Sequence, residues 1–259
     1  MSLLAVAGIC LVAGAMIGFL GGLLGIGGGL IAIPALALVL GMPQQLAQGT
    51  ALVLVLPTVM LSVRKYYQHA QFDLRVVFAG ALVSVFFTWV GARLALGIDP
   101  RLLRLSFAGF LFCVALFYVV QARRKRRCAA AAASARSAPA FTPRRAAALS
   151  VATGTLGGFF SVGGAVLAVP VITTVYRLPQ TTAQALALST VIPGSAIALA
   201  TYAWAGQTDW HVGLPLAAGS LLFVAAGVRL AHRMAEWKLR AAFALMLFVT
   251  VALLIVESR

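Results

Sequence analysis

Charged side chains are scarce in this sequence. Only 10% of its 259 residues are charged, whereas a soluble globular domain has about 25%. Hydrophobic residues make up 62%, which is more apolar surface than one core of this size can hide from water. The composition therefore excludes an ordinary soluble domain and predicts an integral membrane protein.

Acidic residues are nearly absent, with five Asp and Glu against 20 Lys and Arg. All of them lie at the ends of apolar segments, at Asp73, Asp99, Asp209, Glu236 and Glu257. Carriers of Na⁺ or H⁺ usually need a carboxylate inside the membrane, and an intramembrane enzyme that acts on a lipid phosphate needs a carboxylate or a metal cluster. The missing acids therefore argue against a cation transporter and disfavour the lipid-phosphate enzyme.

Cysteines are few and show neither a metal site nor a disulfide framework. Cys10, Cys113 and Cys128 share no metal-like spacing, and the sequence has no Cys-x-x-Cys pair. We therefore expect packed or idle thiols, no metal and no cofactor. The apolar start of the chain, residues 1–22, lacks the basic stretch of a cleaved signal peptide and is interpreted as a retained membrane segment.

The basic residues give a formal net charge of +15, which could suggest nucleic-acid binding. They do not form a face or an arm interleaved with aromatic residues, as a nucleic-acid site would. They lie between long apolar stretches, where Lys and Arg mark the cytoplasmic loops of membrane proteins. The charge therefore predicts a lipid bilayer as a partner and no nucleic acid.

Apolar stretches divide the chain into membrane segments. In the first half they are 3–24, 30–40, 46–63, 76–97 and 102–122. A spanning helix needs about 20 apolar residues, so several of these qualify and 30–40 does not. A basic stretch rich in Ala, Ser and Pro follows, with no apolar face to bury. We predict a first membrane repeat (1–122), a cytoplasmic linker (123–145) and a second membrane repeat (146–259) in a bacterial-type inner membrane.

The two halves are related by a repeat with one constant offset. Gly-Phe-Leu-Gly-Gly at 18–22 returns as Gly-Thr-Leu-Gly-Gly at 154–158. Further equivalent pairs are Pro34 and Pro170, Gln48 and Gln184, Pro57 and Pro193, Tyr66 and Tyr202, Asp73 and Asp209, and Arg93 and Arg229. Because a single offset fits throughout without a gap, we predict two homologous structural repeats.

The distribution of Lys and Arg favours inverted repeats over parallel ones. The basic stretch 229–240 is expected in the cytoplasm, which places 203–211 outside and the loop at Arg177 inside. Residues 146–176 then leave and return on one face, and they are too few for two full spans of about 20 residues. We predict an all-α polytopic fold in which each repeat has a broken-helix hairpin plus three transmembrane helices. The parallel alternative puts 229–240 outside, and the three Arg in 93–104 fit neither arrangement.

Glycine runs interrupt both hairpins at equivalent positions. Paired helix breaks in two halves are typical of a transporter's substrate site, because the freed N–H groups and the helix dipole can hold an anion. Close helix packing is the alternative, and it is favoured for Gly14, Gly18 and Gly22 by their four-residue spacing. The candidate substrate-binding residues at the breaks are Gly27, Gly28, Gly29, Ser161, Gly163 and Gly164.

Neutral polar side chains that follow each break complete the candidate site. They are Gln48, Thr50, Gln184, Ser189 and Thr190. Prolines inside these segments free a carbonyl and kink the helix axis. The predicted kinks are at Pro34, Pro57, Pro170 and Pro193. Neutral donors beside a bent helix suit an oxyanion without the desolvation cost of a buried charge, and interhelical hydrogen bonding is an equal alternative.

Arg93 and Arg229 are repeat-equivalent and end their spans. Their favoured role is to extend to the membrane interface, as long basic side chains near helix ends commonly do. The alternative is that they attract anions at the two mouths of a pathway.

The glycine-rich motifs read Gly-Phe-Leu-Gly-Gly-Leu-Leu-Gly-Ile-Gly-Gly-Gly-Leu-Ile-Ala-Ile-Pro at 18–34 and Gly-Gly-Ala-Val-Leu-Ala-Val-Pro at 163–170. They resemble the motifs of the TauE/SafE family of sulfite and organosulfonate exporters. The resemblance implies an inner-membrane transporter of small anions. Gly25 and Gly29 correspond to Ser161 and Ala165, so the two half-sites differ and Ser161 Oγ is a candidate ligand donor.

We therefore predict a secondary transporter, of exporter type, for a small anion such as sulfite or an organosulfonate, and not an enzyme. A passive anion channel is the alternative, because sequence alone does not separate a channel from a carrier. The expected partners are the anion and the bilayer, and a homo-oligomer is compatible with the sequence.

Overall fold

The computed structural model describes residues 3–67, 74–128, 141–162 and 164–234, and six single positions between 239 and 250. Within this part of the chain every element is an α-helix, and six helices are long and apolar enough to cross a membrane. The prediction of an all-α polytopic membrane protein is confirmed. Outside the described residues lie Asp73, Gly163, the linker centre 129–140 and most of the last membrane segment predicted for the second repeat.

The described helices fall into two sets that follow the repeat. The first set is α1 (Leu3–Leu24), α2 (Gly29–Leu40), α3 (Gln44–Tyr67), α4 (Leu74–Leu96) and α5 (Pro100–Cys128). The second set is α6 (Pro143–Phe160), α7 (Ala165–Val175), α8 (Gln180–Trp204) and α9 (Trp210–Arg233). The short helices α2 and α7, of 12 and 11 residues, are too short to span a bilayer.

Both hairpins break where the glycine runs predict it. After α1 the chain turns through Gly25, Gly27 and Gly28, with φ angles of 66°, 72° and 83°. Glycine reaches this left-handed region without the steric cost of a Cβ atom, so the helix ends and restarts as α2. In the second hairpin, Ser161 at φ 56° and Gly164 at φ 65° adopt the same left-handed region.

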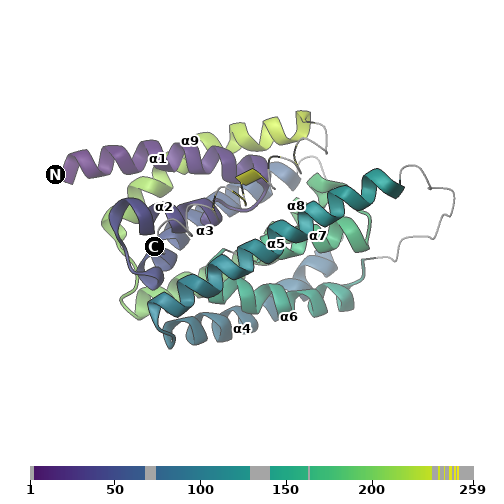
Figure 1. Ribbon diagram of the computed structural model, residues 1–259, viewed down its shortest axis with the longest axis horizontal. Helices are drawn as coiled ribbons and strands as arrows, with labels where there is room; N and C mark the ends of the chain where they lie inside the picture. Colours follow the sequence, from purple (N-terminus) through teal and green to yellow (C-terminus); the bar gives the residue numbers. More distant parts are fainter. Residues whose placement is uncertain are drawn as a thin grey trace.

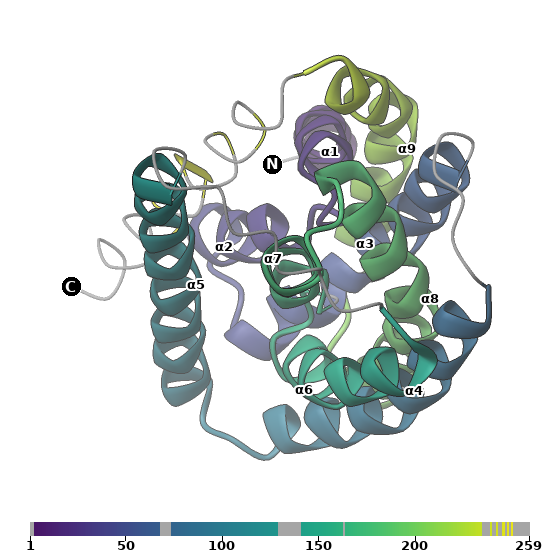
Figure 2. The same cartoon turned by 90° about the vertical axis from the view of Figure 1, so that its right-hand side faces the viewer.

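Helices of one repeat pack along helices of the other. In both ribbon views, α1 lies beside α9 and α4 lies beside α6 (Figures 1 and 2). Gly18 lies against the backbone of Ser220, and its equivalent Gly154 lies against the backbone of Ser84, the equivalent of Ser220. A side chain at either glycine would meet the neighbouring helix, so both glycines permit close packing. The two repeats are therefore interlocked.

Pairs of residues in contact define the relative direction of the helices. On one side of the bundle the pairs are Gly14 and Leu216, Gly22 and Val224, Val53 and Gly213, and Thr58 and Ser220. On the other side they are Gly80 and Ser150, Thr88 and Gly158, Gly80 and Thr190, and Ser84 and Gly194. From one pair to the next, the residue number rises in both helices, so the paired helices run parallel. Helices α1, α3 and α9 therefore share one direction, and α4, α6 and α8 share another.

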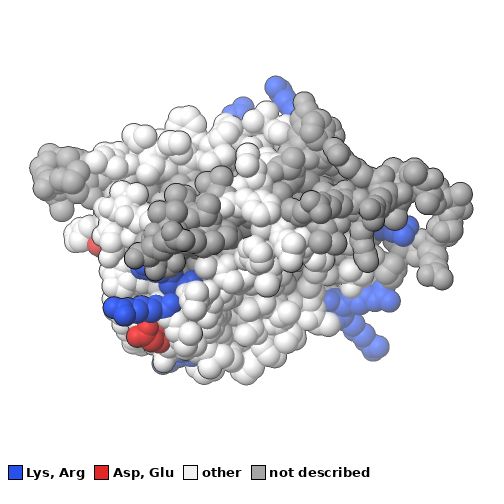
Figure 3. All heavy atoms as spheres, viewed as in Figure 1, with Lys and Arg blue, Asp and Glu red and all other residues white. Residues whose placement is uncertain are grey.

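The described surface has the polarity of a membrane protein. Large apolar side chains are exposed along the outer helices, including Leu11, Val12, Phe78, Leu82, Phe86, Leu105 and Phe112. On the face drawn in Figure 3, acidic residues lie only at the left end, and a broad white surface separates the Lys and Arg there from those at the right and top. An uncharged band between charged ends, with exposed apolar side chains on the outer helices, fits a bilayer that surrounds the bundle.

Candidate functional site

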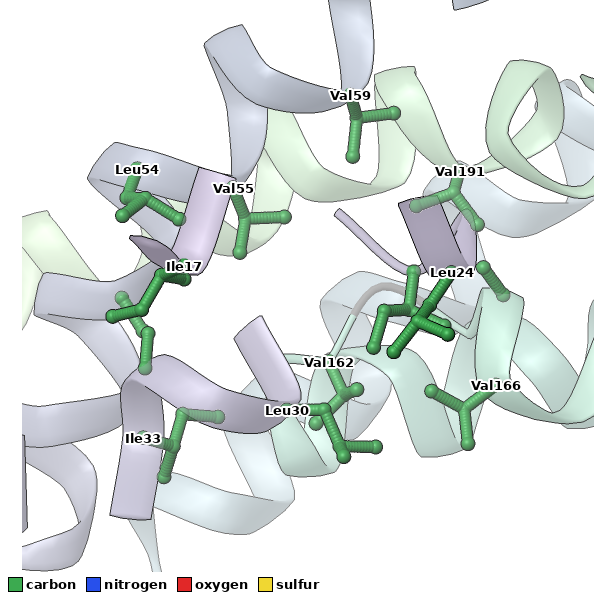
Figure 4. Close-up of a cluster of buried hydrophobic side chains, with 14 of the residues drawn as sticks. Ile17, Leu24, Leu30, Ile33, Leu54, Val55, Val59, Val162, Val166 and Val191 are labelled. Carbon is green, nitrogen blue, oxygen red and sulfur yellow. The ribbon is translucent and has the colours of Figure 1, made fainter. Parts of the chain in front are cut away.

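The two helix breaks meet inside the bundle. A Cβ atom built on Gly29 would lie 3.2 Å from the Ser161 carbonyl oxygen and 3.6 Å from Val162 Cα. The start of α2 in the first repeat thus touches the end of α6 in the second. Figure 4 shows Leu30, which follows Gly29, close to Val162 in the same cluster. The structure therefore brings the two predicted half-sites together.

At each break, the amino end of a short helix lies inside the bundle without a capping side chain. Gly28 precedes α2 and Gly164 precedes α7, and neither helix has a side-chain cap. The Gly28 carbonyl accepts from Ile31 and Ala32, whereas the first N–H groups of a helix have no acceptor within it. The partial positive charge of a helix amino end favours an anion in this position.

The surroundings of the first break are apolar. Ile17, Leu24, Leu54, Val55 and Val59 are among the buried side chains that enclose it (Figure 4). A Cβ atom on Gly27 would lie 2.5 Å from Val59 Cγ2, and one on Gly28 would lie 3.0 Å from Ile17 Cγ2. These two glycines therefore contact packed side chains, and their replacement by a large residue would disrupt the fold whether or not an anion binds.

The second break carries a cluster of neutral polar groups. Tyr202 Oη donates to Gln48 Oε1 over 2.8 Å and lies 3.5 Å from the Gly158 carbonyl. Ser161 lies close to the same Tyr202 hydroxyl. Within the described residues, Gln48 Nε2 and Ser161 Oγ are buried and have no hydrogen-bond partner. The Gln48 amide nitrogen and the Ser161 hydroxyl are thus two buried donors without an acceptor among the described residues.

At the first break, the equivalent glutamine and tyrosine both donate to backbone carbonyls at the end of α1. Gln184 Nε2 donates to the Leu24 carbonyl over 2.7 Å, and Tyr66 Oη donates to the Gly22 carbonyl over 2.9 Å. Gln184 Oε1, an acceptor, is the amide atom that has no partner among the described residues. The glutamine here closes the end of α1, and its amide nitrogen already has an acceptor.

The exchange of glycine for serine accounts for this difference. A Cβ atom on Gly25 would lie 2.5 Å from Gln184 Cγ, so Gln184 occupies space that only glycine leaves open. Ser161, the equivalent of Gly25, has a side chain in that space. Gln48 bonds Tyr202 instead, and its amide nitrogen is left free. The two half-sites are therefore chemically unequal, with unused donors concentrated at the second break.

The other candidate hydroxyls lie elsewhere. Thr50 Oγ1 accepts from the Asp209 backbone N–H over 3.0 Å, which ties α3 to the start of α9. Ser189 and Thr190 donate to carbonyls of their own helix and are half-buried. The structure does not join these three residues to the cluster at the second break. Pro34, Pro57, Pro170 and Pro193 lie inside α2, α3, α7 and α8, respectively.

The two arginines end exposed helices. The Arg93 guanidinium lies 5.8 Å from the Trp89 ring centroid, at a surface groove of about 370 Å³ that Thr201 and Trp204 also line. Trp204 is 94% exposed, as expected for a residue at a membrane interface. Arg229 Nε donates to the Ala225 carbonyl over 3.3 Å and is exposed. Neither arginine reaches the breaks.

Sequence reasoning missed two polar features of the interior. Gln44, at the start of α3, is fully buried, and Ser195 lines a cavity of about 10 Å³, with space for about one water molecule. The other hydroxyls of this cavity belong to Ser84, Thr88 and Thr153. The match of Gln44 with Gln180 in the repeat was a signal for the first feature. No cluster of potential metal ligands occurs within the described residues.

Comparison with known proteins covers almost the whole chain. Residues 10–254 match the family described as "Sulfite exporter TauE/SafE". A Xylella fastidiosa (strain 9a5c) protein named "Probable membrane transporter protein" is 27% identical over 228 residues, which cover 87% of this chain and 85% of that protein. "Probable membrane transporter protein YunE" of Bacillus subtilis (strain 168) is 23% identical over 231 residues, covering 82% and 84%. No solved structure gives a significant match.

Proposed function

The chain belongs to the sulfite exporter TauE/SafE family, and from this premise we propose that it is a secondary transporter that exports a small anion such as sulfite or an organosulfonate. The family and the relatives named as membrane transporters make it a multi-pass membrane transporter. The anion, the outward direction, the bacterial-type inner membrane and the cytoplasmic place of the linker are parts of the proposal.

One observation carries the choice of an anion. Gln48 Nε2 and Ser161 Oγ are buried donors without a partner among the described residues, and they lie by the break that precedes α7. Leaving a buried donor unsatisfied costs about 1–3 kcal/mol. An oxyanion held there would accept both hydrogen bonds and would also be favoured by the amino end of α7.

The acidic residues of the described region support the same choice. Asp99 lies between α4 and α5, and Asp209 caps the amino end of α9. Both lie at helix ends, away from the meeting point of the breaks. The apolar enclosure keeps water away, so fixed dipoles there act on a charge more strongly than they would in water.

We further infer that the two repeats are inverted. The α8–α9 connection, 205–209, is too short to reach the far end of a helix of about 36 Å, so α9 returns antiparallel to α8. Since α9 shares its direction with α1 and α3, and α8 shares its direction with α4 and α6, equivalent helices point in opposite directions. Inverted repeats around a pair of broken helices are a common plan for transporters with alternating access.

The test is counter-exchange in proteoliposomes. Vesicles loaded with unlabelled sulfite, sulfate, thiosulfate, sulfoacetate or acetate are diluted into the labelled form of the same anion. A carrier accelerates uptake when the same anion is trapped inside, and we expect this for at least one sulfur oxyanion. Uptake without acceleration would favour the passive channel, and no uptake of any of the five anions would contradict anion transport.

Side-chain variants then locate the site. Ser161→Ala removes one donor without placing a new atom in the packed breaks. Gln48→Leu removes the amide donor together with the Oε1 atom that accepts from Tyr202. We expect each to weaken the apparent affinity by about tenfold, the value of a hydrogen bond to a charged group. Unchanged affinity in both variants would contradict the site at the second break.

A further inference from the structure

A second pair of glutamines lies one helical turn before the pair at the breaks. Gln44 is the first residue of α3 and Gln180 is the first residue of α8. Gln48 and Gln184 follow four residues later, so each pair lies on one face of its helix, with a rise of about 6 Å between its members. All four side chains are buried.

Gln44 has no structural partner that would explain its burial. It is 0% exposed, and neither its Oε1 nor its Nε2 makes a hydrogen bond within the described residues. A buried primary amide normally has partners, because burial removes its hydrogen bonds to water and an unsatisfied amide does not replace them. Its amide is therefore available to a bound species that can exchange hydrogen bonds with it, such as an anion or water.

The neighbouring residue shows what a structural glutamine looks like at this place. Gln45 Nε2 donates to the Ile98 carbonyl over 2.7 Å and to the Ala95 carbonyl over 3.5 Å. It thereby ties the start of α3 to the end of α4. Gln44 points to a different side of the same helix turn, and its side chain makes no hydrogen bond to another helix among the described residues.

The two glutamine pairs begin at opposite ends of the bundle. Gly49, near the start of α3, lies against Gln207 in the connection that follows α8. The start of α3 therefore lies at the end of the bundle where α8 finishes, and Gln180 lies at the end where α8 begins. One pair thus leads inward from each end, and both lead toward the meeting point of the breaks.

We propose that Gln44–Gln48 and Gln180–Gln184 form two amide steps along which the anion passes between each mouth and the breaks. This inference rests on the proposed transport of a small oxyanion. A neutral amide donates through its N–H groups without fixing the anion as a buried cation would, which suits a site that must also release its ligand. The same amide oxygens can accept from a protonated form of the anion.

The decisive comparison is Gln44→Leu against Gln45→Leu in the full-length protein. Gln44→Leu removes no hydrogen bond of the fold, so the melting temperature is expected to stay constant or rise. Sulfite counter-exchange per folded protein should slow by about tenfold, the effect of one lost hydrogen bond to a charged ligand. Gln45→Leu should do the reverse, with a lower melting temperature and an unchanged exchange rate per folded protein.

A second variant covers the case in which Gln44→Leu fails to fold. Gln44→Glu keeps the size of the side chain and places a carboxylate on the path. Relative to wild type at each pH, its exchange should be lowest above neutral pH and recover toward pH 5, where protonation removes the charge.

Two results would overturn the path. One is Gln44→Leu with a lower melting temperature and wild-type exchange, together with a loss in Gln44→Glu that does not vary with pH. That outcome would assign Gln44 a structural role and leave anion transport intact. The other is wild-type protein that exchanges neither sulfite nor the other four anions, which would contradict the proposed function and the path with it.

Discussion

Tyr202 Oη donates to Gln48 Oε1 over 2.8 Å, and this hydrogen bond joins the second repeat to the first. The equivalent tyrosine, Tyr66, donates instead to the Gly22 carbonyl of its own repeat over 2.9 Å. Both rings are fully buried. Tyr202 therefore holds Gln48 by its acceptor oxygen and leaves the amide nitrogen free, whereas Tyr66 fixes only the backbone at the end of α1.

This difference predicts that Tyr202→Phe and Tyr66→Phe will separate stability from transport. Each variant loses the short hydrogen bond that its hydroxyl donates, and Tyr202→Phe also loses the 3.5 Å contact with the Gly158 carbonyl, so both should be destabilised by about 1 kcal/mol in a thermal melt. Tyr202→Phe also frees Gln48 to rotate, and its apparent affinity for the anion in counter-exchange should fall. Tyr66→Phe serves as the matched control and should keep the wild-type affinity. Equal losses of affinity in both would contradict the role of Tyr202.

Variants at Ser161 should separate the effect of its backbone strain on stability from the effect of its hydroxyl on anion affinity. Its φ angle of 56° is costly for a residue with a Cβ atom, so Ser161→Gly should stabilise the protein by roughly 1 kcal/mol. Ser161→Ala keeps the strain. Both variants lose the hydroxyl and should bind the anion about tenfold more weakly. A Ser161→Gly protein with wild-type affinity in the exchange assay would show that Oγ is not a ligand.

Glycines at the interlocked helix pairs should tolerate no side chain. Gly18→Ala places Cβ against the backbone of Ser220 and is expected to destabilise the protein by several kcal/mol, within the range of overpacking and backbone displacement. At Gly109 in α5, no atom lies within 4 Å of the position that an alanine Cβ would occupy, so Gly109→Ala should gain up to about 1 kcal/mol of helix propensity. Detergent-solubilised melting temperatures measure both, and a stable Gly18→Ala protein would contradict the close packing of α1 on α9.

The sequence was sufficient for the features that depend on local backbone chemistry and on the repeat. The glycine run at 25–29 predicted the break after α1, because few other residues adopt the turn that follows Leu24. Which way a helix faces could not be predicted. Thr50 lies two residues after Gln48, about 200° around the helix, and therefore points away from it to Asp209. Gln44 was missed for the same reason, since its burial depends on the partners of α3.

Asp209 is expected to act as a helix cap and not as a carrier of coupling protons. Its side chain accepts from the backbone N–H groups of His211 and Val212 at the start of α9. Asp209→Ala should therefore cost about 1 kcal/mol, while Asp209→Asn keeps the cap. Exchange driven by a pH gradient should be unchanged in Asp209→Asn, measured beside wild type in the same vesicles. A loss of all proton dependence in that variant would assign the carboxylate to coupling.

Equivalent connections should face opposite sides of the membrane if the repeats are inverted. Gly41 between α2 and α3 and Arg177 between α7 and α8 are repeat-equivalent and exposed. After replacement of the native cysteines, Gly41→Cys should react with a membrane-impermeant maleimide in intact cells, because positive charge keeps the loop at Arg177 inside. Arg177→Cys should react only after permeabilisation. Gly206→Cys is the control, since neighbouring Gln207 lies against Gly49 near the start of α3 and position 206 is therefore on the same side as Gly41. It should react with the maleimide under the same conditions as Gly41→Cys. Labelling of 41 and 177 from one side would establish parallel repeats instead.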